Sequence, residues 1–129
     1  MIQVDDVKKQ IGDQEILRGV SFEVKQGSIT TLIGRSGAGK SLLLRHLIGL
    51  DQPDSGRILI DGKDIVGLGT SALNTIRRRF GVLFQDGALF DSMSVLDNVA
   101  FPLREHTKLS ENQILEEAAQ KLNLVGLGS

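Results

Sequence analysis

Apolar and polar residues alternate in two stretches near the start of the chain. The alternating apolar positions are Ile2, Val4, Val20, Phe22 and Val24. A period of two is typical of strands with one buried face, and the Gly12-Asp13 pair between the stretches favours a turn. The pattern therefore predicts two half-buried antiparallel strands, and we expect Gly27 to end the second one.

Three later runs predict short strands. Residues 28–33 form a β-branched run without charge, which is typical of a buried strand. Residues 57–60 lie between a chain-breaking segment at 52–56 and a turn sequence at 61–62, so we expect a strand there as well. The apolar run at 81–84 predicts a core strand that lies parallel to 28–33.

Helices are predicted by apolar spacing and by capping residues. The leucine-rich segment 42–48 indicates a helix directly after the strand at 28–33. Thr70 or Ser71 is expected to cap a second helix that continues to about Arg79.

Two capping boxes predict the last two helices. Ser94 and Asp97 form the first box, so we expect a short helix at 95–101 that stops before Pro102. Ser110 and Gln113 repeat the device and open a helix that ends near Gly126. One apolar face of this last helix is expected to contain Ile114, Ala118 and Leu122.

The segment between the strand at 28–33 and the helix at 42–48 fits the phosphate-binding pattern G-x-x-x-x-G-K-[ST] without a mismatch. Its residues are Gly34, Arg35, Ser36, Gly37, Ala38, Gly39, Lys40 and Ser41. Glycines allow successive backbone N–H groups to wrap a polyphosphate, and the helix that follows turns its positive end toward the anion. Lys40 then supplies a charge for the β- and γ-phosphates, and Ser41 supplies a hydroxyl ligand for Mg²⁺. The alternative is a glycine-rich turn with a purely structural role.

Composition narrows the classes of function. The chain has 129 residues, of which 40% are hydrophobic, so it can bury an ordinary core. Its net charge of -1 argues against a general nucleic-acid binder, which needs clustered basic residues. The absence of cysteine excludes disulfides and thiolate chemistry. No apolar run reaches the roughly 18 residues of a spanning helix and no signal peptide is visible, so we expect a soluble chain.

These motifs, in this order, resemble those of an ABC transporter ATPase. The resemblance rests on residues 16–22, the loop at 34–41, residues 53–58, and the strand that ends at Gln85 before Leu89-Phe90. It implies an α/β fold in which a RecA-like P-loop NTPase core carries an antiparallel β-lobe. By the same resemblance, residues 1–90 would hold that core and lobe, and residues 91–129 would begin the helical subdomain.

The family resemblance also implies function. ATP with Mg²⁺ would bind the loop, Gln85 would touch the metal or the attacking water, and Ser41 and Gln85 would be the metal-side residues. Gln85 would also lie beside the cleft for a membrane permease subunit. A second ATPase subunit would bind head to tail, and the protein would be cytoplasmic, on the inner face of the membrane. A narrower resemblance, in residues 83–90 and 95–107, is to the ATPase subunit of phospholipid transporters that work with MCE proteins.

Two departures from the family pattern affect these expectations. The family usually places an aromatic near Ile11 to stack on adenine, and a stacked ring adds roughly 0.5–1.5 kcal/mol that isoleucine does not supply. The sequence also contains no L-S-G-G signature, no strand ending in Asp-Glu and no switch histidine. The chain therefore resembles the N-terminal part of such an ATPase, truncated before the signature. The alternative is a truncated, non-hydrolysing nucleotide-binding or assembly module.

Several other residues can be interpreted either as structural or surface residues or as functional ones. Asp86 could be a Walker B aspartate, which would make the chain a small P-loop kinase or GTPase. The basic run 77–79 could bind phosphate or anionic lipid, although such runs are usually solvated helix faces. His46, among leucines, is expected to be structural, and His106 and the pair at 116–117 are expected to be on the surface.

Overall fold

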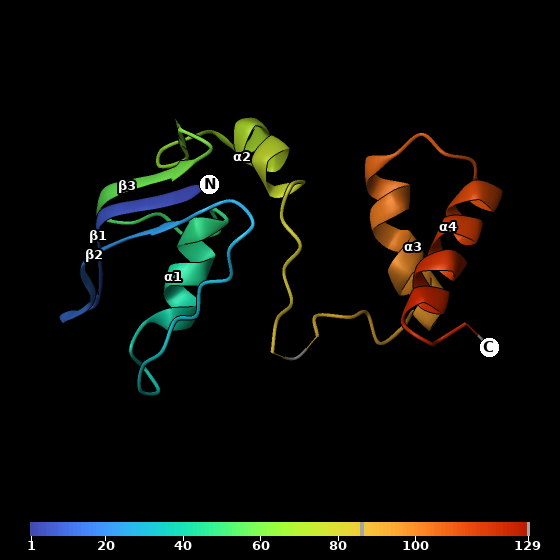
Figure 1. Ribbon diagram of the computed structural model, residues 1–129, viewed down its shortest axis with the longest axis horizontal. Coiled ribbons are helices and arrows are strands. Elements are labelled where there is room, and N and C mark those ends of the chain that lie inside the picture. The colour runs from blue at the N-terminus through green and yellow to red at the C-terminus, as the bar shows by residue number, and fades with distance from the viewer. Residues whose placement is uncertain (86, 129) are drawn as a thin grey trace. The chain divides into compact units, whose positions relative to one another are not determined.

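The computed structural model describes residues 1–85 and 87–128 (Figure 1). The chain divides into two compact units, Met1–Gly81 and Val82–Ser129. Each unit has a hydrophobic core of its own and is described separately below. No helix of the described residues is both long and apolar enough to cross a bilayer.

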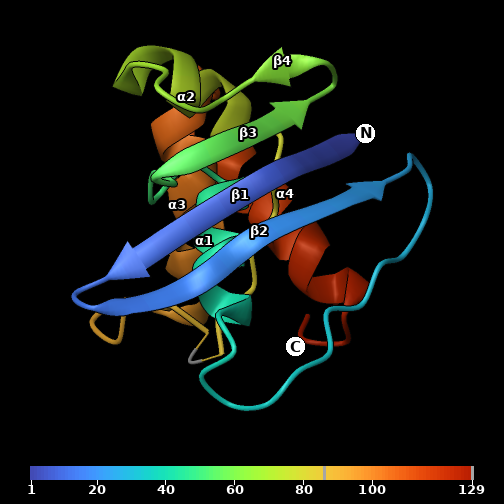
Figure 2. The same ribbon diagram turned by 90° about the vertical axis from the view of Figure 1, so that its left-hand side faces the viewer.

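The first unit is built on a four-stranded antiparallel sheet with the strand order β2-β1-β3-β4 (Figure 2). Its strands are β1 (Ile2–Ile11), β2 (Gln14–Val24), β3 (Ser55–Ile60) and β4 (Lys63–Asp64). In the β1–β2 ladder Ile2 pairs with Val24, and Val4 pairs with Phe22. The two alternating stretches therefore form the antiparallel pair that the sequence predicts, and the strand expected at 57–60 is also present.

One face of this sheet is covered by α1 (Lys40–Leu47), and α2 (Thr70–Arg77) packs into the same core (Figure 2). The buried residues of this core are Val4, Val7, Leu17, Leu43, Leu47, Ile58, Ile60, Ile65, Leu73 and Ile76. Thr70 and Ser71 do not cap α2, because Gly69 occupies the N-cap position with an extended backbone and without a side-chain cap. The helix also stops at Arg77, two residues before the predicted end.

The two segments predicted as parallel core strands, 28–33 and 81–84, are not strands in the structure. Ile29 and Ile33 are 97% and 93% exposed, and Leu83 is 89% exposed. A strand is held by ladder hydrogen bonds to a neighbour, and the described sheet pairs only β1 to β4, all antiparallel. Apolar β-branched sequence without a paired neighbour therefore does not suffice to order either segment as a strand.

The second unit is a hairpin of two helices, α3 (Val95–His106) and α4 (Glu111–Leu124) (Figure 1). Ala100, Ile114 and Ala118 form its core, and Leu122 is only half-buried. The Ser110–Gln113 capping box is formed as predicted. The end predicted for the helix at 95–101 is wrong, because α3 continues through Pro102 to His106. Proline removes one intrahelical hydrogen bond, and the packing of Val99 and Leu103 against α4 offsets that loss.

Candidate functional site

The loop at 34–41 leads directly into α1, and its glycines adopt the backbone that the phosphate-binding pattern requires. Gly37 has φ +78° and Gly39 has φ +86°, and Gly39 is the N-cap of α1. A Cβ atom on Gly37 would meet no atom within 4 Å, so the backbone of the loop is open to an approaching ligand there. The Ala38 N–H donates to the Arg35 carbonyl at 3.2 Å and closes a turn inside the loop.

Lys40, the first residue of α1, folds back over the loop. Its Nζ donates to the carbonyl oxygens of Gly34 and Arg35, both at 2.8 Å. The ammonium charge therefore lies against the loop, beside the end of α1 at which the first backbone N–H groups have no partner within the helix. Both features favour a bound anion, so these residues fit a triphosphate.

Gly39 also fixes the loop against the sheet. A Cβ atom at this position would lie 2.9 Å from Cγ2 of Ile16 and 3.0 Å from Cδ2 of Leu17, both residues of β2. Only glycine permits this close approach at a positive φ. The start of α1 is therefore held at a fixed distance from β2.

A hollow of about 500 Å³ lies next to the start of α1. Lys40 and Ser41 line it together with Thr30 and Thr31, and its other walls are apolar. The exposed Ser41 thus lines a large hollow beside the loop. No group of three His, Asp or Glu side chains that could hold a metal ion converges in the described part of the chain.

The remaining residues of the sequence hypothesis lie outside the loop. Ile11 is the last residue of β1, pairs with Gln14 and is 56% exposed. Gln85 belongs to the second unit, before α3, and its side chain is exposed. Asp86, considered above as a Walker B aspartate, lies outside the described residues.

The basic run 77–79 is not a uniformly solvated face. The Arg77 guanidinium is half-buried and donates to the carbonyl oxygens of Ile48 and Gly49. Arg79 forms an ion pair with Asp61, and Arg78 is exposed. Sequence reasoning missed the role of Arg77, because the carbonyls that it binds lie 28 and 29 residues earlier in the chain.

His46 is structural, as expected from its leucine neighbours. It is 1% exposed, and its Nδ1 lies 2.7 Å from the carbonyl oxygen of Leu42, one helical turn earlier. Nε2 is buried without a hydrogen-bond partner among the described residues. The buried ring therefore has a structural role in the first unit.

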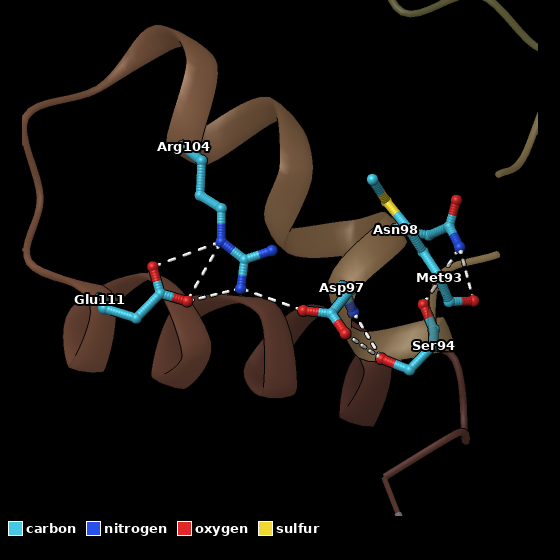
Figure 3. A network of polar contacts seen from close by, with 6 residues as sticks. All are labelled: Met93, Ser94, Asp97, Asn98, Arg104 and Glu111. Atoms are coloured by element: carbon cyan, nitrogen blue, oxygen red, sulfur yellow. Dashed lines mark hydrogen bonds and ion pairs between the residues drawn. The ribbon is translucent and has the colours of Figure 1, made fainter.

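A polar network links the two helices of the second unit (Figure 3). Arg104 of α3 donates to Glu111 of α4 at 2.5 Å and to Asp97 at 3.0 Å, and the Ser94 hydroxyl donates to Asp97 at 2.6 Å. The Arg104 hydrogen bond lowers the pKa of Glu111. The Ser94 hydroxyl, and next the Arg104 guanidinium, lower the pKa of Asp97. Both carboxylates are therefore held ionised across the α3–α4 contact.

Comparison with known proteins identifies relatives of this chain. A family model described as ABC transporter matches residues 17–129. The probable ribonucleotide transport ATP-binding protein mkl of Mycobacterium leprae is 50% identical over 127 residues, which are 98% of this chain and 37% of that protein. The intermembrane phospholipid transport system ATP-binding protein MlaF of Haemophilus influenzae is 46% identical over 127 residues, 98% of this chain and 48% of that protein.

Solved structures give the same fold. The dimeric, post-hydrolysis structure of the ATP-binding cassette MJ0796 with ADP and Pi matches with a TM-score of 0.87 and 28% identity, over 98% of this chain and 57% of that chain. This likeness confirms the predicted α/β class with a P-loop core. The chain spans about a third to a half of the length of the two curated relatives above. The family model and these identities together establish that the chain belongs to the ABC transporter family.

Proposed function

We propose that this chain binds Mg·ATP through residues 34–41, as the nucleotide-binding part of an ABC transporter ATPase subunit. The observation that carries the proposal is the position of Lys40, whose ammonium group lies over its own loop at the start of α1. The loop carbonyls hold the charge there with two hydrogen bonds, and oxygens of a phosphate can replace them as acceptors.

Four residues of the loop then have a defined task. Gly37 leaves the backbone accessible, and Gly39 sets the direction in which α1 starts. The first N–H groups of α1 donate to phosphate oxygens, and Lys40 neutralises part of their charge. Ser41 offers its hydroxyl to the metal, with Gln85 as the second metal-side residue. Bound Mg²⁺ would neutralise charge between the β- and γ-phosphates.

The test of this proposal is nucleotide binding by the Lys40→Ala variant. A charge-assisted contact to phosphate contributes roughly 1.5–3 kcal/mol, so the affinity for ATP should fall by more than tenfold. Fluorescent ATP would be titrated into the 129-residue chain with Mg²⁺. Lys121→Ala, which removes an exposed lysine from α4, is the matched control and should bind as the parent does. Equal dissociation constants for the parent and Lys40→Ala would refute the assignment of the loop.

Ile11 is the residue that we propose at the adenine face of the site. It offers dispersion contacts in place of a stacked ring, so the affinity should depend weakly on the base. ATP and GTP should therefore compete for the loop with dissociation constants within about tenfold of each other. A strong preference for one base would require another residue to read it.

For the complete transporter, we propose that Gln85 couples nucleotide state to a membrane permease. The protein would act at the cytoplasmic face of the membrane, with a second ATPase subunit bound head to tail. The support is family membership and the exposed position of Gln85 before α3. In the assembly that contains this chain, Gln85→Ala should reduce transport more than nucleotide binding. Unchanged transport and unchanged stimulated hydrolysis would remove Gln85 from this role.

A phospholipid is the cargo that we propose. The support is the likeness to MlaF together with the sequence of residues 83–90 and 95–107. The likeness to mkl, which is named for ribonucleotide transport, makes a ribonucleotide the competing cargo. ATP hydrolysis by the assembly in lipid nanodiscs should respond to the phospholipid headgroup and not to added ribonucleotides. If hydrolysis responded to added ribonucleotides and not to the headgroup, a ribonucleotide would be the better candidate for the cargo.

A further inference from the structure

The end of α1 that lies away from the loop is held by one side chain of α2. Arg77 Nε donates to the carbonyl oxygen of Ile48 at 3.0 Å, and its Nη2 donates to that of Gly49 at 2.5 Å. Its Nη1 donates to Oδ1 of Asn74 on the same helix at 3.1 Å, which orients the guanidinium. All three nitrogens of the guanidinium are thus engaged, two of them by the segment that follows α1.

Apolar contact reinforces this attachment. Gly49 has φ +66°, and a Cβ atom there would lie 2.7 Å from Cδ2 of Leu73. Leu73 and Ile76 of α2 are buried in the same core as Leu43 and Leu47 of α1. The segment that directly follows α1 is therefore packed against α2 closely enough for Arg77 to reach its backbone.

Physical chemistry gives the guanidinium two effects at this position. The C-terminal end of a helix needs hydrogen-bond donors at and just beyond its cap. Ile48 is the C-cap of α1 and Gly49 follows it, and Arg77 donates to the carbonyl groups of both. The same end carries the negative pole of the helix, which a cation stabilises. A helix of 8 residues has little stability of its own, so such contacts strongly affect its order.

The opposite end of α1 carries the phosphate-binding residues. Gly39 is packed against Ile16 and Leu17 of β2, and Lys40 and Ser41 follow in the first turn. At about 1.5 Å per residue, α1 is only about 12 Å long, so a change of its tilt at one end displaces the other. The two attachments, at Gly39 and at Arg77, together fix the direction in which the first turn of α1 points.

We propose that Arg77 is a positioning residue for nucleotide binding: through the carbonyls of Ile48 and Gly49 it holds α1 so that its first turn faces the phosphates. This inference rests on the proposed function of the loop. It assigns Arg77 no contact with the nucleotide. It also separates Arg77 from the adjacent Arg78, which is exposed and makes no comparable contact in the described part of the chain.

The test compares ATP affinity in the 129-residue chain with Arg77→Ala, Arg77→Lys and Arg78→Ala, at a temperature at which circular dichroism shows all of them folded. Arg77→Ala should weaken ATP binding by about tenfold, because two charge-assisted bonds and the charge at the helix end are lost. Arg77→Lys keeps the charge without the planar fork and should lie between Arg77→Ala and the parent. Arg78→Ala should bind as the parent does. The hydrogen-bonded backbone amides 43–47 of α1 should exchange with deuterium faster in both Arg77 variants, and at the rate of the parent in Arg78→Ala.

The outcomes separate this inference from the function on which it rests. If the parent shows no ATP binding that depends on Lys40, the proposed function fails and the inference fails with it. If the parent binds and Arg77→Ala binds equally well, only the inference is overturned, even where the variant melts earlier. If Arg77→Ala does not fold, Arg77→Lys decides the question, and an affinity equal to that of the parent, with unchanged amide exchange at 43–47, overturns the inference.

Discussion

The ammonium group of Lys40 lies 2.8 Å from the carbonyl oxygen of Gly34, six residues earlier in the same loop. This contact closes the loop on itself. A phosphate must therefore draw the ammonium from two carbonyl acceptors, whose hydrogen bonds are exposed to water. The cost of that exchange is small, because an exposed hydrogen bond contributes little net free energy.

The stability of the chain should consequently depend little on Lys40. We expect Lys40→Ala to change the free energy of unfolding by less than about 1 kcal/mol, although we expect it to weaken ATP binding by more than about tenfold. Urea unfolding followed by circular dichroism measures this quantity. A much larger loss would mean that Lys40 supports the fold, and the binding test would then need Lys40→Arg in its place.

Gly39→Ala should harm both the fold and the loop. The alanine would have to adopt the φ of +86° that Gly39 has, which is strained for any residue with a Cβ atom. Its methyl group would also press on Ile16 and Leu17. Strain and overpacking together should cost about 2–4 kcal/mol of unfolding free energy. The matched control is Gly37→Ala, with φ +78° and no neighbour within 4 Å, which carries the backbone strain alone. Equal losses for the two variants would contradict the close packing of Gly39 on β2.

The α3–α4 hairpin should lose stability in acid. Hydrogen bonds lower the folded-state pKa values of Asp97 and Glu111 below their ordinary values of 3.8 and 4.5. Their contribution is therefore complete above pH 4.5 and is lost as the pH falls through the lowered folded-state pKa values. The helical signal at 222 nm, measured in thermal melts between pH 7 and pH 2, should show a falling midpoint in this window.

Arg104→Gln tests the cause of that acid sensitivity. The variant removes the cation that faces both carboxylates, so the midpoint should fall less steeply below pH 4.5 than in the parent. Glu117→Gln removes an exposed carboxylate from α4 and is the control, which should keep the slope of the parent. If the melting midpoints of the parent and of Arg104→Gln depended equally steeply on pH, the acid sensitivity would have to arise from other groups.

The 129-residue chain should bind Mg·ATP at best weakly and should not turn it over. Its sequence contains neither the signature loop that would close on the γ-phosphate of a partner subunit nor the carboxylate that would orient water. Phosphate release at saturating ATP should equal that of Lys40→Ala, which controls for contaminating ATPases. A rate near 1 s⁻¹, about the low end of ordinary enzymes, would make Asp86 the first candidate for a catalytic carboxylate.

Local signals allowed the antiparallel part of the fold to be predicted. The alternation at Ile2 and Val4 and the capping box at Ser110 each lie within one element and its turn, so their physical cause is visible in the sequence. The loop at 34–41 is local in the same sense. Gly37 and Gly39 have positive φ values there, a backbone that glycine adopts readily.

Features that depend on distant partners could not be predicted. Residues 28–33 have the composition of a buried strand, yet strand formation depends on a neighbour with which they can pair. Arg77 and Arg78 are both arginines, so the sequence does not distinguish their roles. They differ because α2 packs beside the segment that follows α1, where Arg77 reaches the backbone and Arg78 stays exposed. The passage of α3 through Pro102 likewise depends on packing against α4.

The exposed segment 28–33 determines how this chain should behave at high concentration. It presents Ile29 and Ile33 to solvent beside backbone groups that lie outside the ladders of the described sheet. A six-residue stretch with high β-propensity and no charge is a template for intermolecular strand pairing and for capture by chaperones. Self-association of the chain should therefore begin at this segment. The solubility of the chain should rise in the variant Ile29→Lys, because Ile29 contributes to neither core.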